Sequence, residues 1–257
     1  MTRPEPNIKE PPDRSFTGLR QFNCPEGLSL AGRRDRMAPH WAHWFSGAGM
    51  VDRLALALSD RNAIDMKEFT ESIEFFQRIR RAIRARTVMD LCCGHGLTGL
   101  LFAIFERSVD SVLLIDQRQP QSFEQVYDAA LEVAPWIKNK VQFRECELDD
   151  ISGELDEETG LIGVHACGVR TDEILSLARK HKLAVAVMPC CHALVKYGER
   201  PRAFDETIGQ ELAVDIDRTY RLRSDGFDVR WTVIPRAITP MNRVIIAIPQ
   251  LSDGVVS

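Results

Sequence analysis

The segment from Val88 to Gly99 has the residue types and the spacing of a cofactor-binding loop. Its sequence, Val-Met-Asp-Leu-Cys-Cys-Gly-His-Gly-Leu-Thr-Gly, runs from an apolar stretch through a Gly-x-Gly-x-x-Gly turn into a helical pattern. Glycines let the backbone approach a ligand closely, and N–H groups at the start of a helix can hold an anionic group. A strand, this turn and a helix in succession predict a site for a nucleotide-containing cofactor. The three glycines are Gly94, Gly96 and Gly99.

Three acidic residues near this loop help to distinguish between cofactors. Asp90 lies four residues before Gly94, where its carboxylate can face a cation such as the ammonium of a methionine moiety but would be badly placed beside a pyrophosphate. Asp116 follows the second predicted strand, 20 residues after Gly96, where a carboxylate can bind both hydroxyl groups of a ribose. Glu147 follows the third strand and could reach an adenine. Ribose recognition suits NAD and S-adenosylmethionine (SAM) alike, so the position of Asp90 favours SAM.

Each of these acids also has an interpretation without a cofactor. Asp90 could cap the helix or the loop, Asp116 could be a surface acid, and Glu147 could belong to a solvated loop. The same glycine turn also occurs in NAD-linked oxidoreductases, which therefore remain an alternative class.

Two further segments place histidine and cysteine at the ends of predicted strands. They are 165–172, His-Ala-Cys-Gly-Val-Arg-Thr-Asp, and 188–192, Met-Pro-Cys-Cys-His. Ligands of an open parallel sheet bind at the carboxyl ends of its strands, so we expect both segments beside the glycine loop, where a methyl acceptor must lie. A hydroxyl acceptor must also lose its proton, and histidine titrates in a suitable range. The candidate catalytic residues are His192, His165 and Cys191, and His165 is also a candidate cofactor contact.

The same side chains offer a competing interpretation as a zinc site, whose ligands would be Cys167, Cys190, Cys191 and His192. Adjacent cysteines are an awkward ligand pair and the chain has no C-x-x-C motif, so we predict no metal site. Cys92 and Cys93 are interpreted as small buried packing residues.

From residue 87 onward, short apolar runs alternate with helical patterns. Such alternation forms βαβ units, so we expect an α/β, Rossmann-like fold with a seven-stranded, mostly parallel sheet flanked by helices. The last two strands lie close together and are expected to pair as an antiparallel hairpin. Helical patterns occupy 98–106, 122–133, 171–180 and about 205–223. The expected strands are 87–91, 111–115, 140–144, 161–165, 184–188, 229–234 and 244–248.

The expected organisation has three parts: a flexible N-terminal arm over 1–35, a helical extension over 36–86, and the α/β domain over 87–257. Apolar residues at spacings of three and four predict an amphipathic helix in the extension. They are Phe69, Ile73, Phe76, Ile79 and Ile83.

Three other features keep two interpretations each. The arginines from Arg78 to Arg86 could contact phosphate groups or form a solvated helix face. Trp41 and Trp44 belong to an aromatic segment that could cover the cofactor or pack the extension onto the sheet. Asn242 and Arg243 could reach a substrate or simply form the turn before the last strand.

The glycine loop and the later Ile115-Asp116 resemble the first two motifs of class I SAM-dependent methyltransferases, and the resemblance extends over roughly 87–249. It implies SAM as cofactor and a reversed seventh strand. Segments 165–172 and 188–192 more narrowly resemble the methyltransferase domains of the tRNA ribose 2′-O-methyltransferase and of the glutathione S-transferase C-terminal domain-containing protein. That resemblance implies an RNA-type acceptor. The chain lacks the zinc-finger-like spacings that begin the former, so the parts that select the substrate differ.

Composition narrows the classes of function. With 44% hydrophobic residues, 27% charged residues and a net charge of −4, the chain is an ordinary globular protein and not a wholly basic nucleic-acid wrapper. No apolar run reaches the roughly 18–20 residues that span a bilayer, and the start has no signal core, so we expect a cytoplasmic protein without a membrane partner. We expect a methyltransferase, a transferase acting by methylation of an oxygen or nitrogen acceptor, with RNA among the acceptors considered. The alternatives are a non-catalytic SAM- or RNA-binding regulator and an NAD-linked oxidoreductase, and the oligomeric state stays open.

Overall fold

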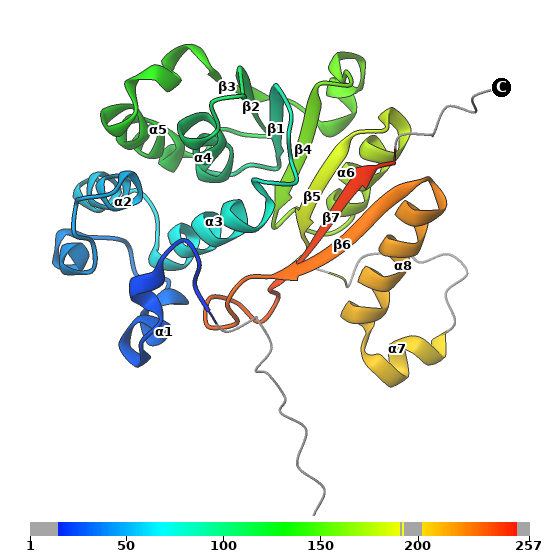
Figure 1. Ribbon diagram of the computed structural model, residues 1–257, viewed down its shortest axis with the longest axis horizontal. Coiled ribbons are helices and arrows are strands. Elements are labelled where there is room, and N and C mark those ends of the chain that lie inside the picture. Colours follow the sequence, from blue (N-terminus) through cyan, green and yellow to red (C-terminus); the bar gives the residue numbers. More distant parts are fainter. Residues whose placement is uncertain (1–14, 191, 193–201, 251–257) are drawn as a thin grey trace, which may run out of the picture.

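The computed structural model of the chain describes residues 15–190, 192 and 202–250. Within them, seven strands form a sheet in the order β3-β2-β1-β4-β5-β7-β6 (Figure 1). Neighbouring strands are parallel except around β7, which runs antiparallel to both β5 and β6. The strands are β1 (Thr87–Leu91), β2 (Ser111–Asp116), β3 (Val141–Glu145), β4 (Thr159–Val164), β5 (Ala184–Met188), β6 (Phe227–Val233) and β7 (Arg243–Pro249).

This sheet confirms the predicted fold, including the hairpin of the last two strands. Each expected strand begins and ends within two residues of an observed one. Since β1 lies between β2 and β4, and β4 lies beside β5, the carboxyl ends of these strands meet at one edge of the sheet. That edge carries the glycine loop and the start of both histidine-containing segments.

Side chains of successive strand residues alternate between two cores, as the strand period of two requires. Val88 and Leu114 belong to the core that includes α3, α4 and α5, whereas Met89 and Leu91 belong to the core that includes α6 and α8. Figure 1 shows α3 and α4 on one side of β1 and β4, with α6 on the other. The helices are α1 (Pro25–Ala31), α2 (Met50–Asp60), α3 (Met66–Ile79), α4 (Leu97–Phe105), α5 (Gln121–Val133), α6 (Arg170–His181), α7 (Arg202–Ile208) and α8 (Gln210–Ser224).

One local expectation needs correction. The single helix expected near 205–223 is interrupted at Gly209, whose φ of +84° breaks the helical hydrogen-bond series between α7 and α8. The N-cap of α6 is Val169. The buried Thr171 hydroxyl in the first turn donates to the carbonyl of Ala166, which ties the helix to the end of β4.

Residues 15–35, the described part of the expected arm, pack against the extension. They form the short η2 (Arg20–Phe22) and α1, and they bury Phe16, Leu19 and Phe22. The carboxylate of the buried Glu74 on α3 accepts hydrogen bonds from three successive backbone N–H groups, beginning at Thr17. These contacts order the segment against α3.

The aromatic segment also packs into this region. It forms η3 (Pro39–Trp44), and the Trp44 ring lies 5.2 Å from that of Phe22. Phe45 is buried and meets Phe69 edge to face at 5.6 Å. The packing interpretation of these aromatics therefore has direct support. Within the described residues, no helix is long and apolar enough to cross a membrane.

Candidate active site

The glycine loop lies between β1 and α4, as its sequence predicts. Gly96 is the N-cap of α4 and has a φ of +75°, a left-handed conformation that favours glycine. A Cβ at Gly99 would lie 3.0 Å from that of Asp90, so the helix can approach the strand closely only without a side chain there. A Cβ at Gly94 would meet no atom within 4 Å, so the loop faces open space at that residue.

Asp90 is buried at the end of β1 and contacts the start of α4. Its Oδ2 accepts a hydrogen bond of 2.8 Å from the backbone N–H of Gly99. Burial raises the pKa of Asp90 to about 7, and the nearby charge of Asp116 acts in the same direction. The side chain therefore forms the capping contact that the sequence left open, while it also lines the cavity beside the loop.

Asp116 and Glu147 lie along the neighbouring strand ends and share a partner that the sequence analysis missed. Asp116 Oδ2 accepts from the N–H of Gly94 at 2.8 Å, and its Oδ1 accepts from the N–H of Gln117. The amide Nε2 of Gln117 donates to both carboxylate oxygens of the exposed Glu147 at 2.8 Å. The order of β1, β2 and β3 thus brings the ribose and adenine candidates to one side of the glycine loop.

A cavity of about 240 Å³ lies on the other side of the loop, between the first half of α3 and the end of β4. It brings together Gly94 of the loop, the buried Asp90 of β1 and the predicted catalytic residue His165. It also includes acids of α3, an element that the sequence analysis did not connect with the site. Its polar lining includes Glu68, Glu71, Asp90, His95 and His165.

His165 is held in this cavity by Glu71. It follows β4 with a φ of +56°, and its Nε2 lies 2.6 Å from Glu71 Oε2. The ammonium of Lys67 bonds both oxygens of Glu71, at 3.0 and 2.8 Å. Burial alone would raise the pKa of Glu71, but the hydrogen bond from His165 and the charges of His165 and Lys67 outweigh it, so this pKa lies below its usual value.

The protonation of this pair follows from its geometry. An ionised carboxylate can only accept, so Nε2 of His165 carries a hydrogen, and in the neutral imidazole Nδ1 then carries the lone pair. Lys67 Nζ lies 3.5 Å from the same Nε2, too far to compete with the Glu71 bond. The arrangement can hold an imidazole in one tautomer at the edge of the cavity, as a proton acceptor requires.

His95 is a further imidazole in the cavity that the sequence analysis did not single out. Its Nδ1 accepts from the N–H of Leu97, which caps the start of α4. Burial lowers the pKa of His95, while the carboxylates of Glu68 and Glu71 act in the opposite direction. Because it caps the N–H of Leu97, this histidine has a structural role inside the glycine loop.

His192 lies in a different environment from His165. Its side chain is buried, its Nε2 lies 3.0 Å from Asp215 Oδ1, and it does not line the cavity described above. Its Nδ1 has no hydrogen-bond partner within the described part of the chain. The catalytic role of His192 stays a prediction, and Cys191 lies outside the described residues.

The turn before β7 also has structural contacts. The side-chain amide of Asn242 donates to the carbonyl of Ile234 at 2.7 Å. The guanidinium of Arg243 bonds Asp215 Oδ2 at 2.8 Å. Both side chains therefore stabilise the end of the sheet.

The cysteines show how the two strand-end segments meet. The thiols of Cys167 and Cys190 lie 3.1 Å apart, so the segments after β4 and β5 are adjacent. Among the residues that the structure describes, no group of three or more histidine, cysteine or acidic side chains is placed to hold a metal ion. Burial raises the pKa of Cys92 to about 12 and raises that of Cys93 as well, so both thiols stay protonated, as packing residues do.

The strand order, the glycine loop after β1 and the acid at the end of β2 define the architecture of a class I SAM-dependent methyltransferase. A family model described as a methyltransferase domain matches residues 64–198, slightly more than half of the chain. The chain therefore belongs to this family of methyltransferase domains. Membership of this family implies SAM as the cofactor.

Individual relatives are more distant. A glutathione S-transferase C-terminal domain-containing protein of Xenopus laevis is 25% identical over 197 residues, which cover 63% of this chain and 31% of that protein. The chain thus spans about a third of the length of this curated relative. A solved protein of Corynebacterium glutamicum has a TM-score of 0.52 at 13% identity, and the match covers 83% of this chain and 96% of that protein. A fibrillarin pre-rRNA processing protein of Methanococcus jannaschii has a TM-score of 0.45 at 12% identity, and the match covers 64% of this chain and 66% of that protein. At 13% identity, the likeness to the Corynebacterium protein concerns the fold alone.

Proposed function

We propose that this methyltransferase transfers the methyl group of SAM to an oxygen or nitrogen atom of an RNA acceptor, with His165 as the proton acceptor. The observation that carries the proposal is the Glu71–His165 hydrogen bond of 2.6 Å at the cavity beside the glycine loop. A methyltransferase needs a cofactor site and an acceptor site in contact, and this cavity borders both the loop and the end of β4.

The loop residues fit the two ends of SAM. In the proposal, Asp90 faces the ammonium of the methionine moiety, Asp116 binds the ribose hydroxyls and Glu147 reaches the adenine. The open space at Gly94 supports this placement because a Cβ there would meet no atom of the described residues within 4 Å, its chain neighbours aside. Gly96 and Gly99 contribute by shape, since they allow α4 to begin close to β1. When bound, SAM supplies an electrophilic methyl group on a cationic sulfur.

His165 and Glu71 have separate tasks in the proposal. The carboxylate of Glu71 fixes the imidazole through Nε2, which directs the lone pair of Nδ1 to the acceptor. His165 removes the proton of a hydroxyl or amine as the acceptor atom becomes bonded to the methyl group. Lys67 keeps Glu71 ionised, so that it accepts from His165 instead of donating.

RNA is the acceptor class that the sequence favours. Segment 165–172, which contains His165, resembles the methyltransferase domains of the tRNA ribose 2′-O-methyltransferase. A ribose hydroxyl needs a proton acceptor, and the Glu71–His165 pair supplies one at this position.

The cofactor is tested first, by ligand-induced thermal stabilisation. SAM and its demethylated product should raise the melting temperature while NAD does not, because only a ligand of the native state shifts the unfolding equilibrium. Asp116→Ala should abolish the shift with SAM, and Asp128→Ala, which removes an exposed acid of α5, should keep it. Absence of any SAM binding to the native chain would falsify the cofactor assignment.

The chemistry is tested with labelled SAM against separated pools of RNA, protein and small molecules. Label should enter the RNA pool, and His165→Asn should reduce the rate about 100-fold or more without loss of SAM binding. Asparagine is the matched replacement because it tolerates the left-handed backbone of residue 165. His43→Asn changes an exposed histidine and should keep full activity. Label in the protein or small-molecule pool alone would reject RNA, and full activity of His165→Asn would reject its role.

A further inference from the structure

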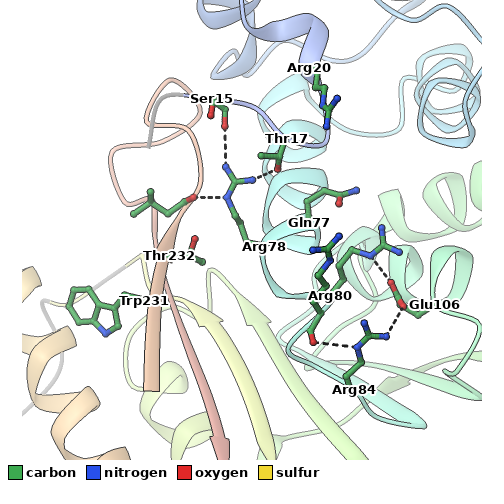
Figure 2. Close-up of a pocket in the computed structure, with 12 residues that line it drawn as sticks. Ser15, Thr17, Arg20, Gln77, Arg78, Arg80, Arg84, Glu106, Trp231 and Thr232 are labelled. Carbon is green, nitrogen blue, oxygen red and sulfur yellow. Dashed lines mark hydrogen bonds and ion pairs between the residues drawn. The ribbon is translucent and has the colours of Figure 1, made fainter. Parts of the chain in front are cut away.

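A second, larger cavity lies between the C-terminal part of α3, the end of β6 and the segment around Thr17 (Figure 2). Its volume is about 980 Å³. Glu106 is the only acidic residue of its lining within the described ranges. The cavity therefore concentrates positive charge in a chain whose net charge is −4. The five arginines that line it are Arg20, Arg78, Arg80, Arg81 and Arg84.

Two of these arginines are held by the protein itself. Arg78 donates from Nε to the carbonyl of Val233 and from Nη1 to Glu74, each at 2.9 Å, as Figure 2 shows in part. Arg80 Nε bonds Glu106 at 2.6 Å. Both guanidinium groups join elements of the fold, so they form the wall of the cavity and add a fixed charge to it.

The other three arginines have exposed guanidinium groups. Arg84 lies 3.9 Å from Glu106 and is 62% exposed, so its ion pair is weak. Arg20 and Arg81 form no ion pair with a described residue, and both are exposed. A guanidinium without a carboxylate partner can bind a phosphate group through two parallel N–H donors.

The dipole of α3 explains only part of this cluster. Cations are favoured within the last turn of a helix by less than about 1 kcal/mol, which accounts for arginines near residue 80. Arg20 belongs to η2, far away in the sequence, and it reaches the same cavity because Glu74 holds the backbone after Ser15 against α3. Two chain segments thus supply cations to one space.

The lining also indicates which part of a nucleic acid would bind. Figure 2 shows Trp231 on the opposite side of β6 from the arginines, and its indole N–H donates to Thr219 at 2.7 Å. Guanidinium groups recognise the phosphodiester backbone and carry no information about base sequence.

Helix α3 connects this cavity to the candidate active site. Glu71 lines the site and Arg78 lines the arginine cavity, seven residues further along the same helix. At 1.5 Å per residue, the two positions are roughly 10 Å apart along the helix axis. Arg81 and Arg84 follow Arg78 within six residues, so α3 connects a strand held by the arginines to the acceptor site.

We infer that the arginine cavity binds the phosphodiester backbone of single-stranded RNA, with Arg20, Arg81 and Arg84 as the phosphate contacts. The choice of RNA rests on the proposed function, whereas the phosphate chemistry rests on the arginines. Because the contacts are to phosphates, binding is sequence-independent and decreases steeply with salt concentration.

The test measures binding of a fluorescent RNA of about 12 nucleotides, a typical site length, by anisotropy at several salt concentrations. The double variant Arg20→Glu and Arg81→Glu should weaken binding more than about tenfold. The slope of log Kd against log salt should also decrease by roughly 0.7 for each lost phosphate contact. The control variant, Arg53→Glu and Arg223→Glu, makes the same change of net charge on α2 and α8 and should bind like the native chain.

The same variants separate this inference from the proposed function. Stabilisation by SAM should be unchanged in both, so a failure of SAM binding would concern the cofactor site alone. Native affinity and native salt slope in the Arg20 and Arg81 variant would overturn the inference, as would absence of RNA binding by the native chain. Inorganic phosphate, measured by calorimetry, should bind far more weakly than RNA. Equal affinity for both would show a site for small anions and would also overturn the inference.

Discussion

At the scale of single residues, Asp90 combines a structural contact with an unusual proton affinity. Its carboxylate is buried and accepts one hydrogen bond from the N–H of Gly99. Burial raises its pKa from the usual 3.8 to about 7, so at mildly acidic pH the folded protein holds a proton that the unfolded chain releases. A cationic ammonium beside Asp90 would favour the charged form. In the proposed function, the ammonium of SAM would thus offset the cost of burying this charge.

The raised pKa predicts a pH-dependent stability. The contribution of Asp90 is fully present below its usual pKa and is lost as pH rises through 7, because the folded state then buries a charge. Asp90→Asn removes this loss. The free energy of unfolding of the variant minus that of the native chain should therefore be roughly 2–3 kcal/mol larger at about pH 8 than at about pH 5. Denaturant titrations at the two pH values measure the difference, with Asp128→Asn as the control. A difference that does not change with pH would contradict the prediction.

At the scale of elements, the junction of β1 and α4 depends on how closely the helix approaches β2. Gly99 lies in the first turn of α4, against the buried side chain of Leu114. The contact fixes the helix start at which Gly96 adopts a left-handed conformation. The glycine spacing therefore serves the packing of the helix as well as the space in front of Gly94.

Gly99→Ala should destabilise the protein by about 1–3 kcal/mol, the usual cost of overpacking a core. The added methyl group would collide with Leu114 and lie 3.0 Å from Asp90 Cβ, so it should also weaken SAM binding by moving that carboxylate. Gly153→Ala is the matched control, because a Cβ there meets no atom within 4 Å. Unfolding in urea and calorimetry with SAM measure the two effects. Equal stability of the two variants would refute the packing argument.

At the scale of the whole molecule, a buried ionic network joins α6, α8, β7 and the segment after β5. Asp215 on α8 contacts His192, Arg243 and Arg218, at 3.0, 2.8 and 3.1 Å. Arg218 is almost fully buried and also forms two bonds to Asp172 in the first turn of α6. The network thus ties the second face of the sheet to the segment that carries the predicted catalytic residue His192.

Asp215→Asn should destabilise the protein by about 3 kcal/mol, since it leaves buried cations without their partner. Asp217→Asn, two residues further along α8, breaks a pair with Arg221 that is partly exposed, and should cost at most about 1 kcal/mol. Burial opposes ionisation of Asp215, but its bonds to His192 and Arg243 outweigh this and lower its pKa. The extra stability is therefore present above the usual pKa and lost as pH falls. Urea unfolding of both variants checks the prediction, which a similar loss in each would contradict.

The sequence by itself determined the seven strands, their mostly parallel arrangement and the glycine loop between β1 and α4. These features follow from local patterns, namely apolar periodicity and glycine spacing within a few residues. It also predicted that His165 and Asp90 lie at one edge of the sheet, because β1 and β4 are neighbouring parallel strands. The break at Gly209 was missed because a glycine can be accommodated in a helix, and only its φ of +84° shows that the helix ends there.

Tertiary structure alone decided which side chains are partners. Glu71 and His165 are 94 residues apart in the chain, and Arg20 reaches the arginines of α3 through a contact made by Glu74. No periodicity records such pairs, because hydrogen bonds and cavities depend on how α3 packs across the sheet. In the sequence, the arginines from Arg78 to Arg86 could be phosphate contacts or a solvated helix face, and the acids of α3 had no assigned role. Packing assigned the acids of its first half to the candidate active site and its arginines to a separate cavity.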